Sequence, residues 1–198
     1  MDWITTSTIL SDLRDNTGRA SGTAAWEQFV SRFRPGIVRF ALKLGLPADA
    51  AEETAQDALL AFAEQFRKGE YDRNRGRLSH WLFGIAYRQA LRQRAAAARR
   101  PAGVAAQSFW HDLPDERSAM VSWDMEWEQA VLDQCIERVR HEVEPATFHA
   151  FELAIMEGRS ASEVAGMLQV SVKMVYNAKH RVLKRIRELR ALLENAEP

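Results

Sequence analysis

The sequence predicts an all-α protein of two helical domains joined by a flexible linker. Along most of the 198 residues, apolar side chains recur at steps of three and four, the spacing that lines one face of a helix. No segment alternates apolar and polar residues as a half-buried strand would, and the sequence contains no internal repeat. The helical periodicity fails over residues 101–122, where prolines, a glycine and mixed polar residues indicate the linker.

This interruption sets the expected domain boundaries. They are an N-terminal extension over residues 1–23, a first domain over 24–100, the linker over 101–122 and a second domain over 123–198. For residues 5–22 of the extension two interpretations stay open: a regulatory segment, or a segment without fixed structure.

The first domain is expected to contain three helices, over residues 26–44, 48–67 and 80–94. Pro35 and Gly36 interrupt the first of them, which predicts a kink or two shorter helices. The polar residues 71–77 are expected to form a loop, and Ser79 is placed to cap the helix that follows.

The second domain contains the pattern of a helix-turn-helix. Its helices are expected over residues 123–143, 161–168 and 172–193. Ser160 and Glu163 have the spacing of a capping box, Ser171 can cap the last helix, and the small Ala165 allows two helices to cross closely. Apolar side chains that can seal the space between these helices are Val164, Leu168, Val170 and Val175. Gln169 stands where such turns usually carry glycine, so its backbone must reach the turn geometry with a side chain attached.

The charges are separated along the chain although they sum to zero. Residues 67–100 carry ten basic against two acidic side chains, and residues 173–190 carry seven against one. Between these two blocks, residues 112–144 carry ten acidic against three basic side chains. Two basic blocks predict two surfaces for a polyanion, because neutralised phosphates release counterions. The alternative is that both blocks are ordinary solvated faces.

The last helix is the candidate for reading duplex DNA. Six of its side chains face away from the apolar stripe and combine phosphate-binding cations with groups that can bond base edges: Lys173, Tyr176, Asn177, His180, Arg181 and Lys184. The alternative for this motif is an ordinary helical hairpin with a basic exterior.

Residues 71–86 of the first domain place basic and aromatic side chains next to one another. Aromatic rings offer stacking faces to unpaired bases while arginines follow the phosphate backbone, so this segment is a candidate for holding one strand of opened DNA. The alternative is that Trp81, Phe83 and Tyr87 belong to the hydrophobic core.

Several classes of function are excluded by what the sequence lacks. The single cysteine, Cys135, rules out an internal disulfide and a cysteine-built zinc site, which favours a reducing compartment, the cytoplasm, and is itself interpreted as a core residue. No export signal and no run of eighteen apolar residues is present. The five histidines show no metal-ligand spacing, and no phosphate-binding loop or nucleophile motif occurs. We therefore expect no enzyme, no catalytic residue, no metal and no cofactor.

With these segments in view, the chain resembles an extracytoplasmic-function sigma factor, the compact two-domain class of the sigma-70 family. Residues 26–100 are similar to the second conserved region of that family and residues 127–193 to the fourth. The motifs that carry the resemblance lie at Asp49–Phe62, Asp72–Phe83 and Val172–Arg181. It implies an alternative sigma factor that binds core RNA polymerase and directs promoter recognition, DNA opening and transcription initiation.

The resemblance also implies roles for individual residues. The polymerase clamp coiled coil would be bound by Asp49, Glu53, Gln56 and Asp57. The minus-ten element would be bound by Arg73, Arg75, Arg77, Leu78, Ser79, His80, Trp81, Arg88 and Arg92, with Leu78, Ser79 and His80 in the loop that receives an extruded base. The six outward residues of the last helix would read the minus-thirty-five element, and the second domain would dock on the polymerase flap.

The chain departs from the family pattern at three places, one of which is the run of alanines over residues 95–98 that interrupts what is commonly an unbroken basic tail. Arg88 and Arg92 stand where the family commonly has Asn and Asp, so the resemblance does not carry over a minus-ten preference. The acidic linker region, with Trp110, Trp123 and Trp127, is interpreted as a spacer or as a mimic of nucleic acid. Whether an anti-sigma factor binds stays open. The rival function is a helix-turn-helix transcriptional regulator that never joins polymerase.

Overall fold

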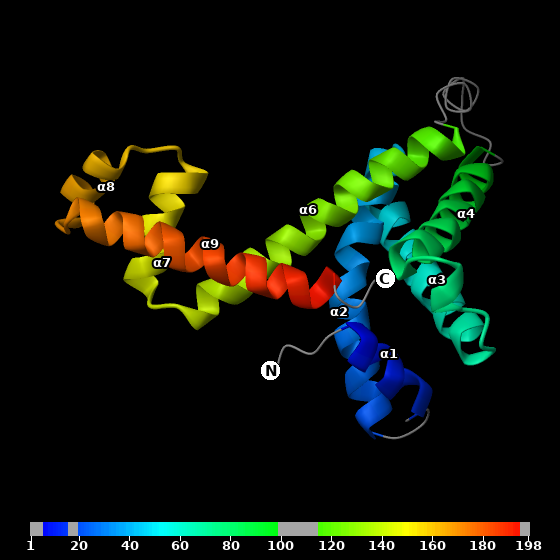
Figure 1. The fold of residues 1–198 in the computed structure, drawn as a ribbon. Coiled ribbons are helices and arrows are strands. Elements are labelled where there is room, and N and C mark those ends of the chain that lie inside the picture. Colours follow the sequence, from blue (N-terminus) through cyan, green and yellow to red (C-terminus); the bar gives the residue numbers. More distant parts are fainter. Residues whose placement is uncertain (1–5, 16–19, 99–114, 195–198) are drawn as a thin grey trace. The chain divides into compact units, whose positions relative to one another are not determined.

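The computed structural model describes residues 6–15, 20–98 and 115–194, and these ranges are helical apart from short turns (Figure 1). They contain no strand, which confirms the all-α fold class. The chain divides into two compact units, called here unit 1, which reaches from the N-terminus to Val131, and unit 2, Leu132–Glu194. This division falls later in the chain than the expected start of the second domain at residue 123. No helix among the described residues is both long and apolar enough to cross a membrane.

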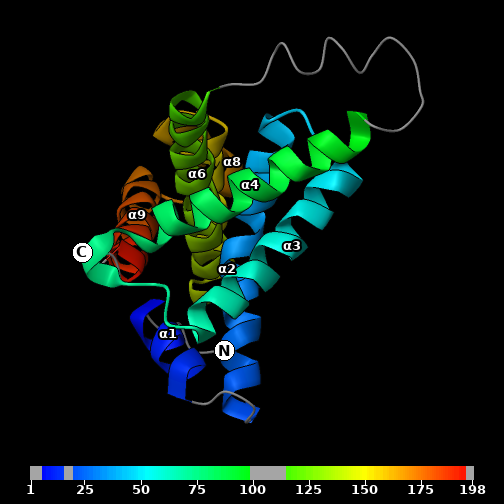
Figure 2. The ribbon, with the colours of Figure 1, turned by 90° about the vertical axis from the view of Figure 1, so that its right-hand side faces the viewer.

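Unit 1 is a bundle built around three long helices that lie side by side (Figure 2). Its helices are α1 (Thr6–Asp15), α2 (Ala20–Lys43), α3 (Ala48–Arg67), the short 3-10 helix η1 (Arg73–Arg75), α4 (Leu78–Ala98) and the first part of α6 (Glu116–Glu142). The second helix agrees with its predicted bounds, 48–67. The third begins two residues before the predicted start, because Leu78 is buried and belongs to the first turn of α4.

Of the two expectations for Pro35 and Gly36, that of two shorter helices is wrong, because α2 continues through both residues. Phe33, Ile37 and Phe40, which flank the proline at helical spacing, are buried on one face of α2. Burial of this face stabilises the continuous helix against the cost of the backbone hydrogen bond that proline cannot make.

The core of unit 1 is rich in aromatic rings from different helices. Phe29 of α2 stacks on Phe62 of α3 with ring centroids 4.2 Å apart, and Ile9 of α1 is fully buried in the same cluster. Residues 6–15 of the N-terminal extension are therefore a helix that packs into the domain, not a segment without structure. Residues 1–5 and 16–19 of the extension lie outside the described residues.

A buried arginine closes the end of α2. Arg94 of α4 donates a hydrogen bond from Nη1 to the carbonyl oxygen of Leu44, at 2.8 Å. The carbonyls at the C-terminus of a helix carry partial negative charge and lack intrahelical donors, so a guanidinium is a favourable partner for them. Gly45, which follows, has a φ of 82°, a value that glycine adopts without strain and that turns the chain into α3.

The segment expected to be the end of the linker is helical. α6 begins at Glu116, seven residues before the predicted start at Trp123, so the assignment of residues 116–122 to the linker is wrong. Asp115 caps this helix by accepting a hydrogen bond from the Ser118 amide at 2.8 Å, which lowers the pKa of its carboxyl. Residues 101–114 of the linker, with Trp110, lie outside the described residues.

The first part of α6 belongs to the core of unit 1. Trp123 is 0% exposed and its ring contacts Phe40 and Phe83, with centroids 5.2 and 6.0 Å away. One turn later, Trp127 stacks on Phe33 at 5.2 Å. A Cβ at Gly36 would lie 3.3 Å from the Trp127 ring, so the glycine gives this tryptophan room against α2.

Unit 2 contains the end of α6, α7 (Pro145–Phe151), the π-helical turn η2 (Glu152–Met156), α8 (Ala161–Leu168) and α9 (Val172–Glu194). The capping box is confirmed: the Glu163 amide donates to Ser160 Oγ at 3.3 Å, and the Ser160 amide donates to Glu163 Oε2 at 2.8 Å. Ser171 caps α9 as predicted, accepting from the Met174 amide at 3.2 Å. Cys135 is fully buried, in agreement with its interpretation as a core residue.

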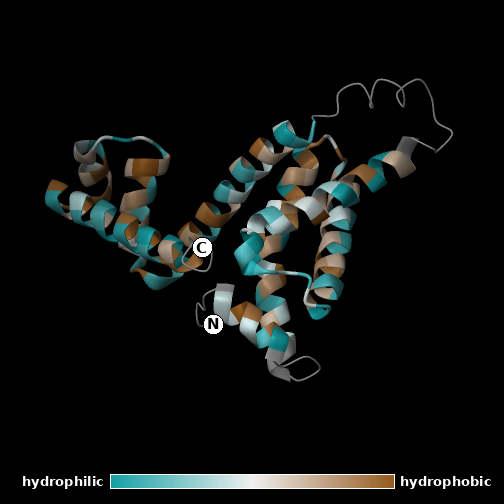
Figure 3. Ribbon diagram, turned by 45° about the vertical axis from the view of Figure 1, so that its right-hand side comes forward, coloured by the Kyte–Doolittle hydropathy of each residue, from teal (hydrophilic) through white to brown (hydrophobic). Residues whose placement is uncertain are grey.

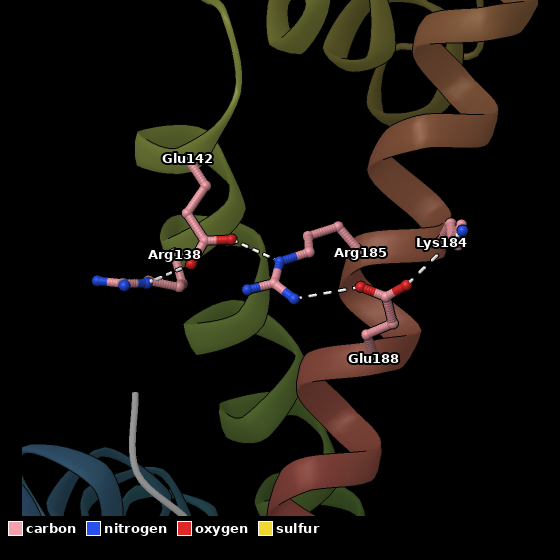
Figure 4. A network of polar contacts seen from close by, with 5 residues as sticks. All are labelled: Arg138, Glu142, Lys184, Arg185 and Glu188. Atoms are coloured by element: carbon pink, nitrogen blue, oxygen red, sulfur yellow. Dashed lines mark hydrogen bonds and ion pairs between the residues drawn. The ribbon is translucent and has the colours of Figure 1, made fainter. Parts of the chain in front are cut away.

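Within unit 2, a chain of ion pairs joins the end of α6 to α9 (Figure 4). Glu142 accepts from Arg185 Nε at 2.6 Å and from Arg138 Nε at 2.7 Å. Arg185 also pairs with Glu188 at 3.2 Å, which in turn lies 4.0 Å from Lys184. The hydrogen bond from Arg185, followed by that from Arg138, lowers the pKa of Glu142 below its ordinary value, although partial burial acts in the opposite direction.

The Glu142→Gln substitution is expected to remove one component of the acid sensitivity of unit 2. Because the folded pKa of Glu142 is depressed, its contribution is present above the unfolded value, near 4.5, and is lost as pH falls through the folded value. The side chains of Glu142, Arg138 and Arg185 are all partly exposed, so their pairing contributes about 1 kcal/mol to the free energy of unfolding. Urea unfolding of the wild type and the variant between pH 3 and 7 measures this. Their free energies of unfolding should differ at pH 7 and become equal toward pH 3. A difference that is constant with pH would contradict the assignment.

Candidate nucleic-acid interface

An acidic and amide face lies along the first half of α3. Asp49, Glu53 and Gln56 are exposed and Asp57 is half-buried, while the opposite face packs into the core through residues that include Ala55, Leu59 and Phe62. Glu52, at the edge of this face and also exposed, pairs with Arg34 of α2. The four residues expected to bind polymerase therefore share one continuous surface. An interface with a basic partner requires accessible acidic and amide groups, and none of these four side chains is fully buried.

A pocket of about 320 Å³ lies between the end of α3 and the start of α4. Its walls are formed by Glu70, Tyr71, Asp72, Arg75, Gly76, Arg77, His80 and Trp81. Asp72 caps the start of η1. Its Oδ1 accepts a hydrogen bond from the Asn74 backbone amide at 2.9 Å and another from the Asn74 side-chain amide at 3.1 Å. The pocket thus combines two aromatic rings with two arginines, and its volume is in the range of pockets that hold small organic ligands.

The aromatic residues of this segment divide between pocket and core. Phe83 is buried in the core, so the core interpretation holds for it. Trp81 is half-buried: its ring packs on Phe62 at 5.2 Å and on Tyr71 at 5.0 Å while still lining the pocket. Tyr87 stacks on Phe83 at 5.5 Å. Of the three, Trp81 alone lines this pocket, where a base could stack on its ring.

Two of the expected loop residues are not in a loop. Leu78 and Ser79 lie in the first turn of α4 and are buried, so Ser79 does not cap the helix from outside as predicted. The physical reason is that Leu78 completes the apolar face of α4, which extends the helix toward the pocket. His80, in the next position, is exposed and lines the pocket.

The expected minus-ten arginines are all exposed. Arg73 and Arg75 lie in η1, Arg77 follows it, and Arg88 and Arg92 lie further along α4. The Arg88 guanidinium folds back along the helix: a Cβ added at Gly84 would lie 3.3 Å from its Nη1. Arg92 Nη1 donates to Gln89 at 3.4 Å. His80, Gly84 and Arg88 are each one turn apart, so they form a single stripe on α4.

The helix-turn-helix of unit 2 has the expected packing. Val164, Ala165 and Val175 are buried in one cluster, and Leu168 and Val170 pack against it. Gln169 adopts the left-handed conformation, with φ at 55° and ψ at 41°, as the turn requires. This geometry costs a residue with a side chain on the order of 1 kcal/mol, which the packing on either side of the turn offsets.

The outward face of α9 presents polar and basic side chains. Val175, Val182 and Ile186 are buried, as predicted, and α9 shows hydrophilic bands between its hydrophobic ones (Figure 3). The six residues expected to face duplex DNA are all exposed: Lys173, Tyr176, Asn177, His180, Arg181 and Lys184. Tyr176 is 61% exposed, so its ring and hydroxyl are accessible to a partner.

Sequence reasoning missed two residues next to the expected sites. Tyr71 lines the pocket and stacks on Trp81, and its aromatic ring at the start of the polar segment was the available signal. Asp124 of α6 lies 3.5 Å from His80 Nε2, a contact within unit 1. No sequence signal pointed to this pair, because forty-four positions separate its members. Among the described residues, no group of histidine, cysteine and carboxylate side chains could hold a metal ion.

Comparison with known protein families gives one match in the first half of the chain. Residues 29–100, from the middle of α2 past the end of α4, match the family model of sigma-70 region 2. The match contains the acidic face of α3, the pocket and the stripe on α4. Over these residues the chain is similar to sigma-70 region 2, which supports a relation to the sigma-70 family. No curated protein matches the chain.

Proposed function

We propose that this protein is a member of the sigma-70 family and an alternative sigma factor of the extracytoplasmic-function type, which joins core RNA polymerase and directs it to promoters. The observation that carries the proposal is the region 2 match over residues 29–100 together with a helix-turn-helix in unit 2. A regulator that acts without polymerase would need the second of these modules and not the first. Unit 2 takes the role of region 4 in this proposal.

The exposed face of α3 is the proposed contact with the polymerase clamp. Asp49, Glu53, Gln56 and Asp57 offer carboxylate and amide groups on a helix whose other side is held rigidly by the core. A rigid helix loses little conformational freedom on docking, which leaves more of the contact energy for affinity.

The pocket at the start of α4 is the proposed receptor for a base turned out of the minus-ten element. Extruding a base costs a few kcal/mol, which contacts in the pocket must return. Trp81 and Tyr71 supply stacking surfaces, and the arginines of η1 lie where the phosphates of the same strand would pass. The stripe of His80 and Arg88 continues this surface along α4.

The outward face of α9 is the proposed reader of the minus-thirty-five element. A helix-turn-helix places the second helix in the major groove, with its first turns nearest the base edges. Lys173, Tyr176 and Asn177 lie in these first turns, and Arg181 lies one turn further along.

The decisive experiment is run-off transcription by purified core polymerase from a library of randomised promoters, with and without the chain. The expected result is initiation that depends on the chain and selects a defined pair of promoter elements. Retention of the chain on immobilised core polymerase is measured in parallel. A chain that neither binds core polymerase nor changes where it initiates would refute the proposal. Duplex binding by such a chain would instead favour the regulator that works without polymerase.

Arg181→Ala is expected to reduce initiation at the selected promoters by roughly ten- to a hundredfold without reducing retention on core polymerase. The reason is that a side chain at a base edge contributes about 1–3 kcal/mol to promoter binding and nothing to assembly. Arg187→Ala is the matched control, since Arg187 is also exposed on α9 but lies nearer its C-terminal end. Equal losses in the two variants would show that α9 supplies only general positive charge.

A further inference from the structure

The first part of α6 lies against the surface of unit 1 that carries the proposed minus-ten site. Trp123 and Trp127 hold it there, with their rings on Phe40 and Phe33. Three exposed acidic residues belong to this part of the chain: Asp115 and Glu116 at the start of α6, and Asp124 two turns later. An acidic helix is thus fixed by its apolar face beside a surface that is expected to receive phosphates.

Two observations place these acidic residues near side chains of α4. Asp124 Oδ1 lies 3.5 Å from His80 Nε2, so the two groups form an ion pair when the imidazole is protonated. Further along, the pKa of Tyr87 is raised, first by burial and then by the negative charges of Glu116 and Asp115. Acidic residues of α6 therefore lie near α4 at two points, Asp124 at His80 and the start of α6 near Tyr87.

We propose that Asp124 of α6 is an intramolecular competitor of promoter DNA, because it occupies the His80 imidazole that would otherwise contact a strand phosphate. The inference rests on the proposed function only in taking the His80 and Arg88 stripe as a DNA-binding surface. Nε2 is the ring nitrogen furthest from the backbone, and it is the atom that Asp124 engages. A phosphate that approaches His80 must displace this carboxylate and meets its negative charge.

The contact between Asp124 and His80 is weak, so DNA can displace the carboxylate. The side chains of His80 and Asp124 are 45% and 53% exposed, and ion pairs at such exposure contribute little to stability. Trp123 stays buried whichever partner His80 has, so only side chains need to move. The expected consequence is a free protein that binds single-stranded DNA less well than its exposed arginines alone would allow.

The test compares the full-length protein with Asp124→Asn for binding to a fluorescein-labelled single-stranded DNA of mixed sequence, by anisotropy. We expect the variant to bind about two- to fivefold more tightly at low salt, because one exposed ion pair and one repulsive charge are removed. Glu126→Gln is the matched control: it removes the same charge from a position about 200° around the helix from Asp124. It should gain much less.

A double-mutant cycle tests whether the gain in DNA binding depends on the contact between Asp124 and His80. In a His80→Ala background, Asp124→Asn should lose most of its advantage, since the group for which it competes is gone. The inference is overturned if Asp124→Asn binds no more tightly than the wild type, or if Glu126→Gln gains as much. Weaker binding would instead make Asp124 a positioning residue for His80. Retention on core polymerase is scored separately, so a chain that fails to bind polymerase yet shows the cycle refutes the proposed function and not this inference.

Discussion

Trp123→Ala is expected to lower the free energy of unfolding of unit 1 by about 3–5 kcal/mol, the largest effect of any substitution considered. The side chain is fully buried between Phe40, Phe83 and Trp127, so its loss removes apolar burial and leaves a cavity among rigid aromatic rings. A loss of this size is a large fraction of the stability of a typical domain. Urea unfolding followed by circular dichroism measures it.

The control for this prediction is Met125→Ala in the same helix. Met125 is 66% exposed, so its truncation should change stability by about 0.5 kcal/mol or less. Trp123→Phe should fall between the two, because phenylalanine fills part of the space and the buried indole Nε1 has no hydrogen-bond partner to lose. A Trp123→Ala protein as stable as the wild type would mean that α6 is not part of the core of unit 1.

The double substitution Gln56→Ala with Asp57→Ala is expected to weaken binding to core polymerase by roughly thirtyfold, which corresponds to about 2 kcal/mol. Both groups lie on the exposed face of α3, so their truncation removes polar contacts at the centre of the proposed interface while the apolar face stays intact. Titration of fluorescently labelled protein with core polymerase measures the change. The circular dichroism spectrum and unfolding midpoint should stay close to those of the wild type.

The matched control is Glu64→Ala with Gln65→Ala. It removes the same kinds of side chain from the same helix, but about two turns further along, near the C-terminal end of α3. We expect it to keep nearly all of the affinity. If both double variants bind as the wild type does, the polymerase contact does not involve this face, and the assignment of the four residues fails.

Much of the candidate site could be predicted because it depends on local patterns. The bounds of α3 and α8 follow from apolar periodicity together with turn residues, and the capping box of Ser160 and Glu163 needs side chains only three positions apart. The left-handed Gln169 followed from the turn in which it stands. The exposed face of α9 followed from the apolar stripe opposite it.

Other features could not be predicted, because they depend on contacts between residues that are far apart in the sequence. Leu78 and Ser79 were expected in a loop, and only the apolar face of α4 against the core shows that they are helical and buried. The tolerance of Pro35 within α2 likewise depends on burial of the flanking residues, which outweighs the local preference of proline.

The sequence by itself determined the helical class, the capped helix-turn-helix and the exposed faces of α3 and α9, because each of these follows from spacings within one or two turns. The tertiary structure decided where unit 1 ends and what lies beside His80. Trp123 stands among acidic residues, which favours the edge of a linker, yet its indole ring is fully buried in the core of unit 1. Its partners, Phe40 and Phe83, are dozens of residues away, and the contact with them brings Asp124 to His80.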